Sequence, residues 1–286
     1  MKGNSSMQST PKPVPDIPTE TFVSARKVYN AQHIYLRIGD QLENILVKVD
    51  LSLLNPCPDE ANDTALRLAL ITAFQYAELL SDQAASEATL RRMDWKYALY
   101  LPLQHPGIST FALCEFRHNL FARPLALREF SRLLAQLGDM GLYTRIEKVS
   151  LEPIKTISSI CQITRLSRLN QAMKTALSVL VAVDPDWLRA NARPHWYERY
   201  KTGRLAAPIQ SGLPSAVDEA NQLGVDMYQL LHALQQSNAP HLNNLIEIRY
   251  LAQLWEEQYQ KNGTEITWQL PGCADCTCNH LGEFNI

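Results

Sequence analysis

Apolar residues recur every three or four positions along most of this chain, the spacing that predicts amphipathic α-helices. One series follows the capping residues Asn62 and Asp63, and another follows Ser109 or Thr110. Proline and glycine punctuate these series, for example at the His105-Pro106-Gly107 turn. The helices predicted in this way cover residues 62–81, 82–92, 95–101, 111–121, 124–138, 157–183, 194–200, 214–234 and 240–259.

The rest of the pattern adds little β-structure. Residues 142–151 alternate between apolar and polar positions, and they are the only strand candidate that this alternation supplies. Residues 1–22 are rich in proline, serine and threonine, so they have too little apolar surface to offset the entropy of ordering them. We therefore predict a disordered leader over 1–22 and a mostly α fold after it.

Composition excludes several classes of protein. With 46% hydrophobic and 20% charged residues, the 286-residue chain has the balance of a globular protein. The longest apolar run, Ala176–Val183, is far below the ~18 residues that a membrane-spanning helix needs. The polar, proline-rich stretch Met1–Pro18 lacks the apolar centre of a secretory signal. We expect a cytoplasmic protein with no membrane partner, in which the scattered Cys57, Cys114 and Cys161 are buried thiols.

The formal net charge of −2 hides an uneven distribution of charge. Residues 1–90 carry 7 Lys+Arg against 11 Asp+Glu, residues 91–175 carry 13 against 6, and residues 176–286 carry 7 against 12. A basic block between acidic flanks is typical of attraction to a polyanion. Clustering of solvated charge without a partner is the alternative interpretation.

Residues 111–121 lie inside this basic block, and their pattern is that of a DNA-reading helix. Leu113, Phe116 and Leu120 share one face, which leaves polar side chains on the outside. A short helix, a turn and then such a helix lets side chains reach base edges while flanking cations hold phosphates. Many amphipathic helices without any ligand have the same pattern. The DNA-binding candidates are Arg91, Arg92, Lys96, Arg117, His118, Asn119 and Arg123.

The C-terminal tail offers a separate hypothesis. Cys273, Cys276, Cys278 and His280 place four soft ligands within eight residues, which is the ligand chemistry of Zn²⁺. A cluster this tight lacks the distant second pair that zinc modules commonly have, so a tail without metal is the alternative.

The stretch Arg91–Leu120 resembles the InsH-type N-terminal region of bacterial insertion-sequence transposases of the DDE class. The resemblance is carried by an ordered series of short motifs, Asp94–Leu99, Leu101–Leu103, Pro106-Gly107 and Glu115–Arg117. Further similar segments are Pro185–Ala190, Trp196–Tyr200 and Leu254–Tyr259, so the resemblance covers roughly residues 34–268. It implies a helical domain that binds double-stranded DNA at transposon ends, and Mg²⁺ as the metal of the parent family.

The resemblance also implies a ribonuclease-H-like catalytic core, of which little is present. Glu152 stands at the position of the first catalytic aspartate, Lys155 replaces a histidine there, and Pro153 removes a backbone donor. The second and third carboxylates of the family have no counterpart before Ile286. Two-metal phosphoryl transfer needs several converging carboxylates. We therefore expect a C-terminally truncated transposase that binds DNA without cofactor and without cleaving it as an isolated chain.

The expected domains are the leader at 1–22, a helical DNA-binding domain at 23–141, a remnant first strand with a helical insertion at 142–270, and the cysteine-rich tail at 271–286. Two alternatives for function stay open. Apolar faces meant for a catalytic core could bind another chain, which predicts a helical protein-interaction module or a homo-oligomer. A separately encoded catalytic fragment could complement this chain as the N-terminal half of a split transposase.

Overall fold

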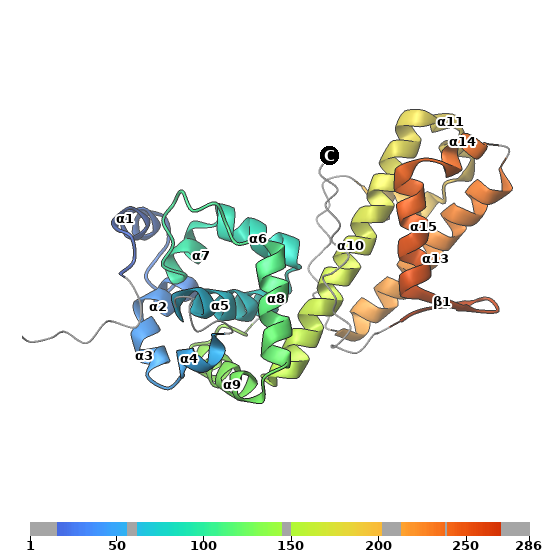
Figure 1. The fold of residues 1–286 in the computed structure, drawn as a ribbon. Coiled ribbons are helices and arrows are strands. Elements are labelled where there is room, and N and C mark those ends of the chain that lie inside the picture. The colour runs from blue at the N-terminus through green and yellow to red at the C-terminus, as the bar shows by residue number, and fades with distance from the viewer. Residues whose placement is uncertain (1–15, 56–61, 145–149, 202–212, 238, 270–286) are drawn as a thin grey trace, which may run out of the picture. The chain divides into compact units, whose positions relative to one another are not determined.

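A computed structural model describes residues 16–55, 62–144, 150–201, 213–237 and 239–269 of the chain (Figure 1). Within these ranges the protein is mostly helical, as predicted, with fifteen helices and one two-stranded sheet. The chain divides into two compact units. Unit 1 comprises residues 1–74 and 85–143, and unit 2 comprises residues 75–84 and 144–286.

Unit 1 is built from short helices, and α5 and α6 also contribute residues to unit 2. These helices are α1 (Thr19–Val28), α2 (Ile34–Asp40), α3 (Leu42–Leu46), α4 (Leu51–Leu54), α5 (Asn62–Glu78), α6 (Asp82–Arg91), α7 (Met93–Ala98), α8 (Thr110–Phe121) and α9 (Pro124–Asp139). The remaining elements belong to unit 2. They are α10 (Pro153–Val183), α11 (Pro185–Asn191), α12 (Pro194–Arg199), α13 (Leu213–Gln236), α14 (Pro240–Asn243), α15 (Ile246–Gln258), β1 (Tyr259–Asn262) and β2 (Glu265–Trp268).

Several helix ends follow directly from the local sequence. The Ser109 hydroxyl accepts a hydrogen bond from the Ala112 amide at 3.2 Å, so it caps α8. Pro124 is the first residue of α9, where its missing N–H costs no hydrogen bond. Asp184 ends α10, and its carboxylate caps α11 by accepting the Trp187 amide at 2.9 Å.

Aromatic packing forms the centre of unit 1. The ring of Phe74 lies 4.7 Å from that of Tyr35 and 5.3 Å from that of Trp95, and both pairs meet edge to face. Beside them, Gly39 of α2 packs directly on Tyr97 of α7, because a Cβ atom at Gly39 would lie 2.7 Å from the tyrosine ring. The sequence therefore needs glycine at this helix crossing.

A polar triad joins α1 and α2 to α7. The Tyr97 hydroxyl donates to the Asp40 carboxylate at 2.6 Å, and the Arg26 guanidinium donates to both groups. Arg26 also lies over the Phe22 and Tyr97 rings. The Thr21 hydroxyl is buried and donates to the Leu101 carbonyl at 2.8 Å. The predicted leader therefore ends too late, because Thr19–Phe22 belong to α1 and are held by these contacts.

Unit 2 is organised around α10, a helix of 31 residues that is about 46 Å long. Helices α13 and α15 pack along it, and Figure 1 shows the three running side by side. Gly224 of α13 leaves room for the Tyr259 ring, since a Cβ atom there would lie 2.3 Å from it. The Tyr259 hydroxyl donates to the Ala220 carbonyl at 2.9 Å, which fixes β1 against α13.

The β-hairpin corrects the strand prediction. Strands β1 and β2 pair antiparallel with Tyr259 opposite Trp268, and Gly263 takes a φ of 62° in the two-residue loop. The loop residues are Gly263 and Thr264, and a glycine at the first position of a two-residue loop is a local hairpin signal. Of the strand predicted at 142–151, residues 142–144 form a turn and residues 145–149 lie outside the described residues. The helix predicted at 240–259 is two helices, α14 and α15.

The cysteines differ in part from the expectation. Cys161 is buried with a free thiol, as predicted. Cys114 is buried but bonded in a disulfide, so the prediction of a thiol is wrong at that position. Spacing along a sequence does not tell which cysteines meet in space. Cys57 lies outside the described residues.

Among the described helices, none combines the length and the apolar character that crossing a membrane requires.

Two tyrosines of unit 1 predict a loss of stability at alkaline pH. Burial, followed by the bond to Asp40, raises the pKa of Tyr97 to about 12, and burial raises the pKa of Tyr100 to about 12. An unfolded tyrosine loses its proton near pH ~10. Between these values the folded chain keeps protons that the unfolded chain releases, so the free energy of unfolding falls as pH rises above about 10.

Urea unfolding at a series of pH values checks this expectation. Each tyrosine contributes a fall of about 1.4 kcal/mol per pH unit in that range. Tyr97→Phe and Tyr100→Phe should each make the alkaline fall in stability less steep than in the wild type. An equal slope in wild type and both variants would contradict the assignment.

Candidate nucleic-acid interface

The segments that resemble the transposase motif lie in α7, in the loop that leads to α8, and in the middle of α8. Asp94, Trp95, Lys96 and Tyr97 are all buried. The Lys96 ammonium donates to the carbonyls of Leu103 and His105. Burial lowers the pKa of Lys96 from its ordinary value, as expected for a desolvated ammonium group.

Side chains from several helices satisfy the other backbone groups of this loop. Arg67 donates to the Leu99 carbonyl at 3.1 Å, and the Thr89 hydroxyl accepts the Ile108 amide at 2.8 Å. His105 Nδ1 accepts the Gly107 amide at 3.1 Å, and Gly107 takes a φ of 89° that favours glycine. The motif therefore fixes the start of α8 through hydrogen bonds.

Lys96 and Arg92, predicted to bind DNA, thus serve the fold instead. Lys96 is 4% exposed, so its ammonium does not reach a phosphate. Arg92 donates to both oxygens of Asp94, at 3.1 and 2.7 Å, and its guanidinium lies 5.0 Å from the Trp95 ring centre. Arg91, in contrast, is exposed at the end of α6.

Helix α8 presents the predicted outer face with one exception, Arg117. Arg117 is buried at 3% exposure, although the helical pattern placed it outside. The exposed positions are Phe111, Glu115 and His118, three or four residues apart on one face, and Asn119 lies half-buried beside them. A carboxylate on this face repels phosphates, although it can accept a hydrogen bond from the amino group of cytosine. Only His118 and Asn119 of the predicted reading residues remain accessible.

Arg123, between α8 and α9, is a bridging residue inside unit 1. Its guanidinium donates to the carbonyls of Asn119, Asn55 and Leu54 at 3.2, 2.8 and 3.1 Å. It therefore closes the end of α4 against the end of α8. The accessible members of the predicted set are Arg91, His118 and Asn119.

Two further accessible cations on α9 escaped the sequence analysis. Arg128 and Arg132 are one helical turn apart, and their side chains are 57% and 51% exposed. Between them lies Glu129, whose side chain is 1% exposed and which occupies a position in the apolar stripe of α9. A glutamate at a core position flanked by arginines was the signal that could have identified this pair.

Glu152 does not share a carboxylate cluster with any other described residue. It precedes α10, and its exposed side chain accepts a bond from Lys155 at 2.9 Å. Among the described residues no three His, Cys, Asp or Glu side chains come together as a metal site. The surroundings of Glu152 within these residues therefore do not fit the two-metal centre of the parent family. The predicted zinc ligands Cys273, Cys276, Cys278 and His280 lie outside the described residues.

One buried carboxylate in unit 2 gathers several polar groups. Asp226 is fully buried and accepts the Tyr200 hydroxyl at 2.6 Å and the Gln222 amide at 3.1 Å. The ring of His195 reaches it at 3.0 Å, and Arg199 Nε lies 3.7 Å away. Burial, followed by the bond to Asp226, raises the pKa of Tyr200. This network anchors α12 on α13, which explains the role of the Trp196–Tyr200 motif.

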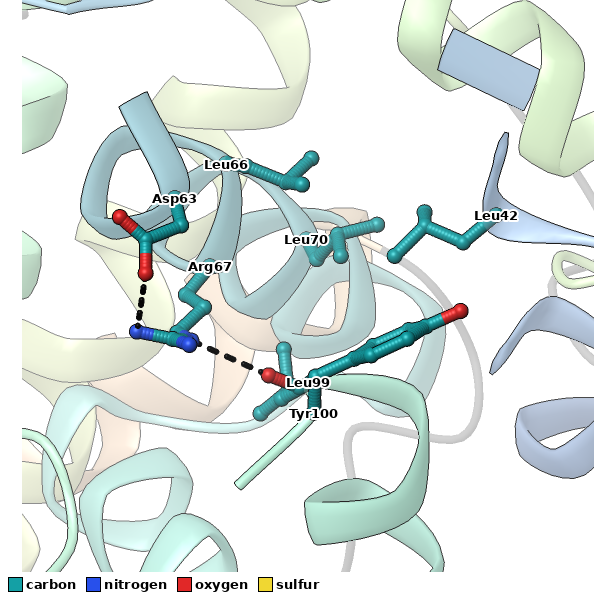
Figure 2. Close-up of a pocket in the computed structure, with 7 residues that line it drawn as sticks. All are labelled: Leu42, Asp63, Leu66, Arg67, Leu70, Leu99 and Tyr100. Atoms are coloured by element: carbon teal, nitrogen blue, oxygen red, sulfur yellow. Dashed lines mark hydrogen bonds and ion pairs between the residues drawn. The ribbon is translucent and has the colours of Figure 1, made fainter. Parts of the chain in front are cut away.

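The polar groups around a small pocket of unit 1 are likewise bonded within the protein. Figure 2 shows its lining residues, and the apolar ones are Leu42, Leu66, Leu70 and Leu99. The guanidinium of Arg67, which also lines the pocket, is paired with Asp63 at 3.1 Å and donates to the Leu99 carbonyl. The Tyr100 hydroxyl donates to the Gly39 carbonyl at 2.5 Å. These polar groups are already paired, so the pocket does not supply a ligand site.

We expect Lys96→Met to destabilise unit 1. The substitution leaves two loop carbonyls without their charged donor, which should lower the free energy of unfolding by about 2 kcal/mol. Arg91→Met is the matched control, because an exposed substitution normally changes stability by less than about 0.5 kcal/mol. Urea unfolding followed by circular dichroism measures both values. Equal stability of the two variants would contradict a structural role for Lys96.

Comparison with protein-family models, with curated proteins and with solved structures finds no significant match. What the chain does is therefore inferred from its own residues and contacts.

Proposed function

We propose that this chain binds double-stranded DNA as a transposase-like protein that recognises transposon ends. One observation carries the proposal. The residues that resemble the transposase motif, from Asp94 to Gly107, are those whose burial and hydrogen bonds build unit 1. A resemblance in residues that determine a fold favours a shared domain and not merely a shared surface pattern.

The surface of unit 1 supports the same proposal. Arg91 is exposed at the end of α6, and His118 and Asn119 are accessible on α8. Cations of this kind contact phosphates, while histidine and asparagine side chains can reach base edges. In this proposal Arg91 contacts the backbone, and α8 contributes the base-edge contacts.

Duplex binding in a salt titration tests the proposal. Fluorescence anisotropy with a labelled transposon-end duplex should give an affinity that falls steeply with salt, and each phosphate contact contributes about 0.9 to the log–log slope. Arg91→Gln should lower that slope by about 0.9. The matched control is Arg189→Gln in unit 2, whose side chain is 73% exposed and which should leave the slope unchanged. An affinity that stays constant over a tenfold salt range would refute DNA binding.

We further propose that the isolated chain binds DNA without cutting it. Glu152 is exposed and paired with Lys155, so it does not share a metal with another described carboxylate. Incubation with supercoiled plasmid and Mg²⁺ should yield no nicked or linear product. Glu152→Gln should leave duplex affinity unchanged and stability within about 0.5 kcal/mol, because an exposed ion pair contributes little. Strand scission that needs Mg²⁺ and disappears in this variant would overturn the proposal.

A further inference from the structure

Arginines in a folded protein are fixed in position only when something holds them, and the α9 pair has such an anchor. Glu129 Oε1 lies 3.4 Å from Arg128 Nε and accepts Arg132 Nη1 at 2.9 Å. Its other oxygen accepts the same Arg132 nitrogen at 3.0 Å and the Asp50 amide at 3.2 Å. Because an unpaired buried carboxylate costs several kcal/mol, on the order of 3–5, both arginines are kept beside it.

The anchoring leaves most of each guanidinium free for a partner. A guanidinium has five N–H donors, and Glu129 takes one nitrogen of each arginine. Both side chains remain more than half exposed, at 57% and 51%. Their positions on α9 place the two Cβ atoms roughly 5–6 Å apart on one face. The result is a pair of forked donors with their orientation set in advance.

The segment before α4 carries a further exposed cation. The bond from the Asp50 amide to Glu129 brings the segment before α4 to α9, and Lys48 of that segment is exposed. The Asp50 carboxylate itself is bonded to the Ser52 amide and hydroxyl at 3.0 and 2.6 Å. Glu129 is covered by its partners, so the exposed charges at this part of α9 are the two arginines and, beside them, the Asp50 carboxylate.

We infer that Arg128 and Arg132, oriented by Glu129 and assisted by Lys48, form a phosphate-contacting surface for the backbone of double-stranded DNA. The inference rests on the proposed function and adds residues that the reading-helix hypothesis did not contain. Planar, forked guanidinium groups match phosphate oxygens bidentately, which an ammonium group cannot do. Contacts to phosphates position a duplex without reading its sequence. The α9 surface therefore supplies affinity, while α8 supplies any base preference.

The experiment measures binding of the full chain to duplexes of about two helical turns, of transposon-end and of scrambled sequence, over a range of salt. Arg128→Gln should lower the log–log slope by about 0.9, and the double variant Arg128→Gln/Arg132→Gln by about 1.8. Both variants should weaken binding to the two sequences by the same factor, since phosphate contacts carry no sequence information.

Glu129→Gln is the matched control. It removes the anchoring charge but keeps both cations, so it should retain the wild-type slope while its affinity falls at every salt concentration, because the arginines lose the group that orients them. Unchanged affinity in folded Glu129→Gln would contradict the orienting role of Glu129. The single variant Arg128→Gln leaves Glu129 bonded to Arg132 and to the Asp50 amide, so it is expected to fold even where the double variant does not. Circular dichroism confirms that each variant is folded.

The outcomes separate the two proposals. If the wild type binds with a salt-dependent affinity and folded Arg128→Gln keeps its full slope, the α9 surface is wrong and DNA binding stands. If the variants lose affinity for only the transposon-end sequence, the arginines read bases and the phosphate assignment is wrong. If the wild type does not bind either duplex, both the proposed function and this inference fail.

Discussion

The carbonyl groups that follow α7 impose the constraint on which unit 1 depends. A chain that turns sharply between two packed helices must find donors for its backbone acceptors wherever packing restricts access of water. Lys96 provides one buried ammonium group for two of these carbonyls, and Arg67 serves a third. Once this loop is fixed, α8 starts at a defined point and direction. The accessible faces of α8 and α9 follow from that geometry.

Buried carboxylates follow the same rule as the buried ammonium group of Lys96: each must find hydrogen-bond partners, which in this case are donors. Asp94, Glu129 and Asp226 are all buried, and each accepts hydrogen bonds from nearby donors. The donors to Asp94 and Glu129 come largely from the same helix or its cap, whereas Tyr200 and His195 join α12 to Asp226 of α13. A metal centre would instead bring several carboxylates together around the ion. Where a paired, buried carboxylate lies near the surface, as at Glu129, it also orients the cations that satisfy it.

Local sequence signals predicted much of the fold. Helix ends were predicted correctly where the deciding contact is local, as at the caps Ser109 and Asp184 and at Pro124 in the first turn of α9. The hairpin has an equally local signal in Gly263, the first residue of its two-residue loop, which apolar periodicity alone does not reveal. Lys96 could not have been assigned in this way. Its partners belong to a loop whose path depends on contacts from α1, α5 and α6.

At the candidate interface, too, local sequence signals and tertiary packing determine different features. Periodicity places a side chain on a face of its helix, but tertiary packing decides whether that face is covered. Arg117 lies on a face that the fold buries, whereas the apolar Phe111 is 58% exposed. The direction of Arg123 was also unpredictable, since its acceptors are carbonyls of α4 and α8. Arg91 and His118 are exposed as the pattern indicated.

Charge counted along a sequence therefore overstates the charge that a partner meets. Within the basic block at 91–175, the side chains of Arg92, Lys96 and Arg123 donate hydrogen bonds to groups inside unit 1. Arg165 binds Gln258, and Arg168 binds the Tyr250 hydroxyl, so much of the block in α10 is also occupied. These five are structural hydrogen-bond donors among the described cations of the block, whereas Arg91, Arg128, Arg132 and Lys155 are exposed. A polyanion that approaches unit 1 is attracted by the few cations left at the surface, and how those cations are oriented then matters more than how many the sequence contains.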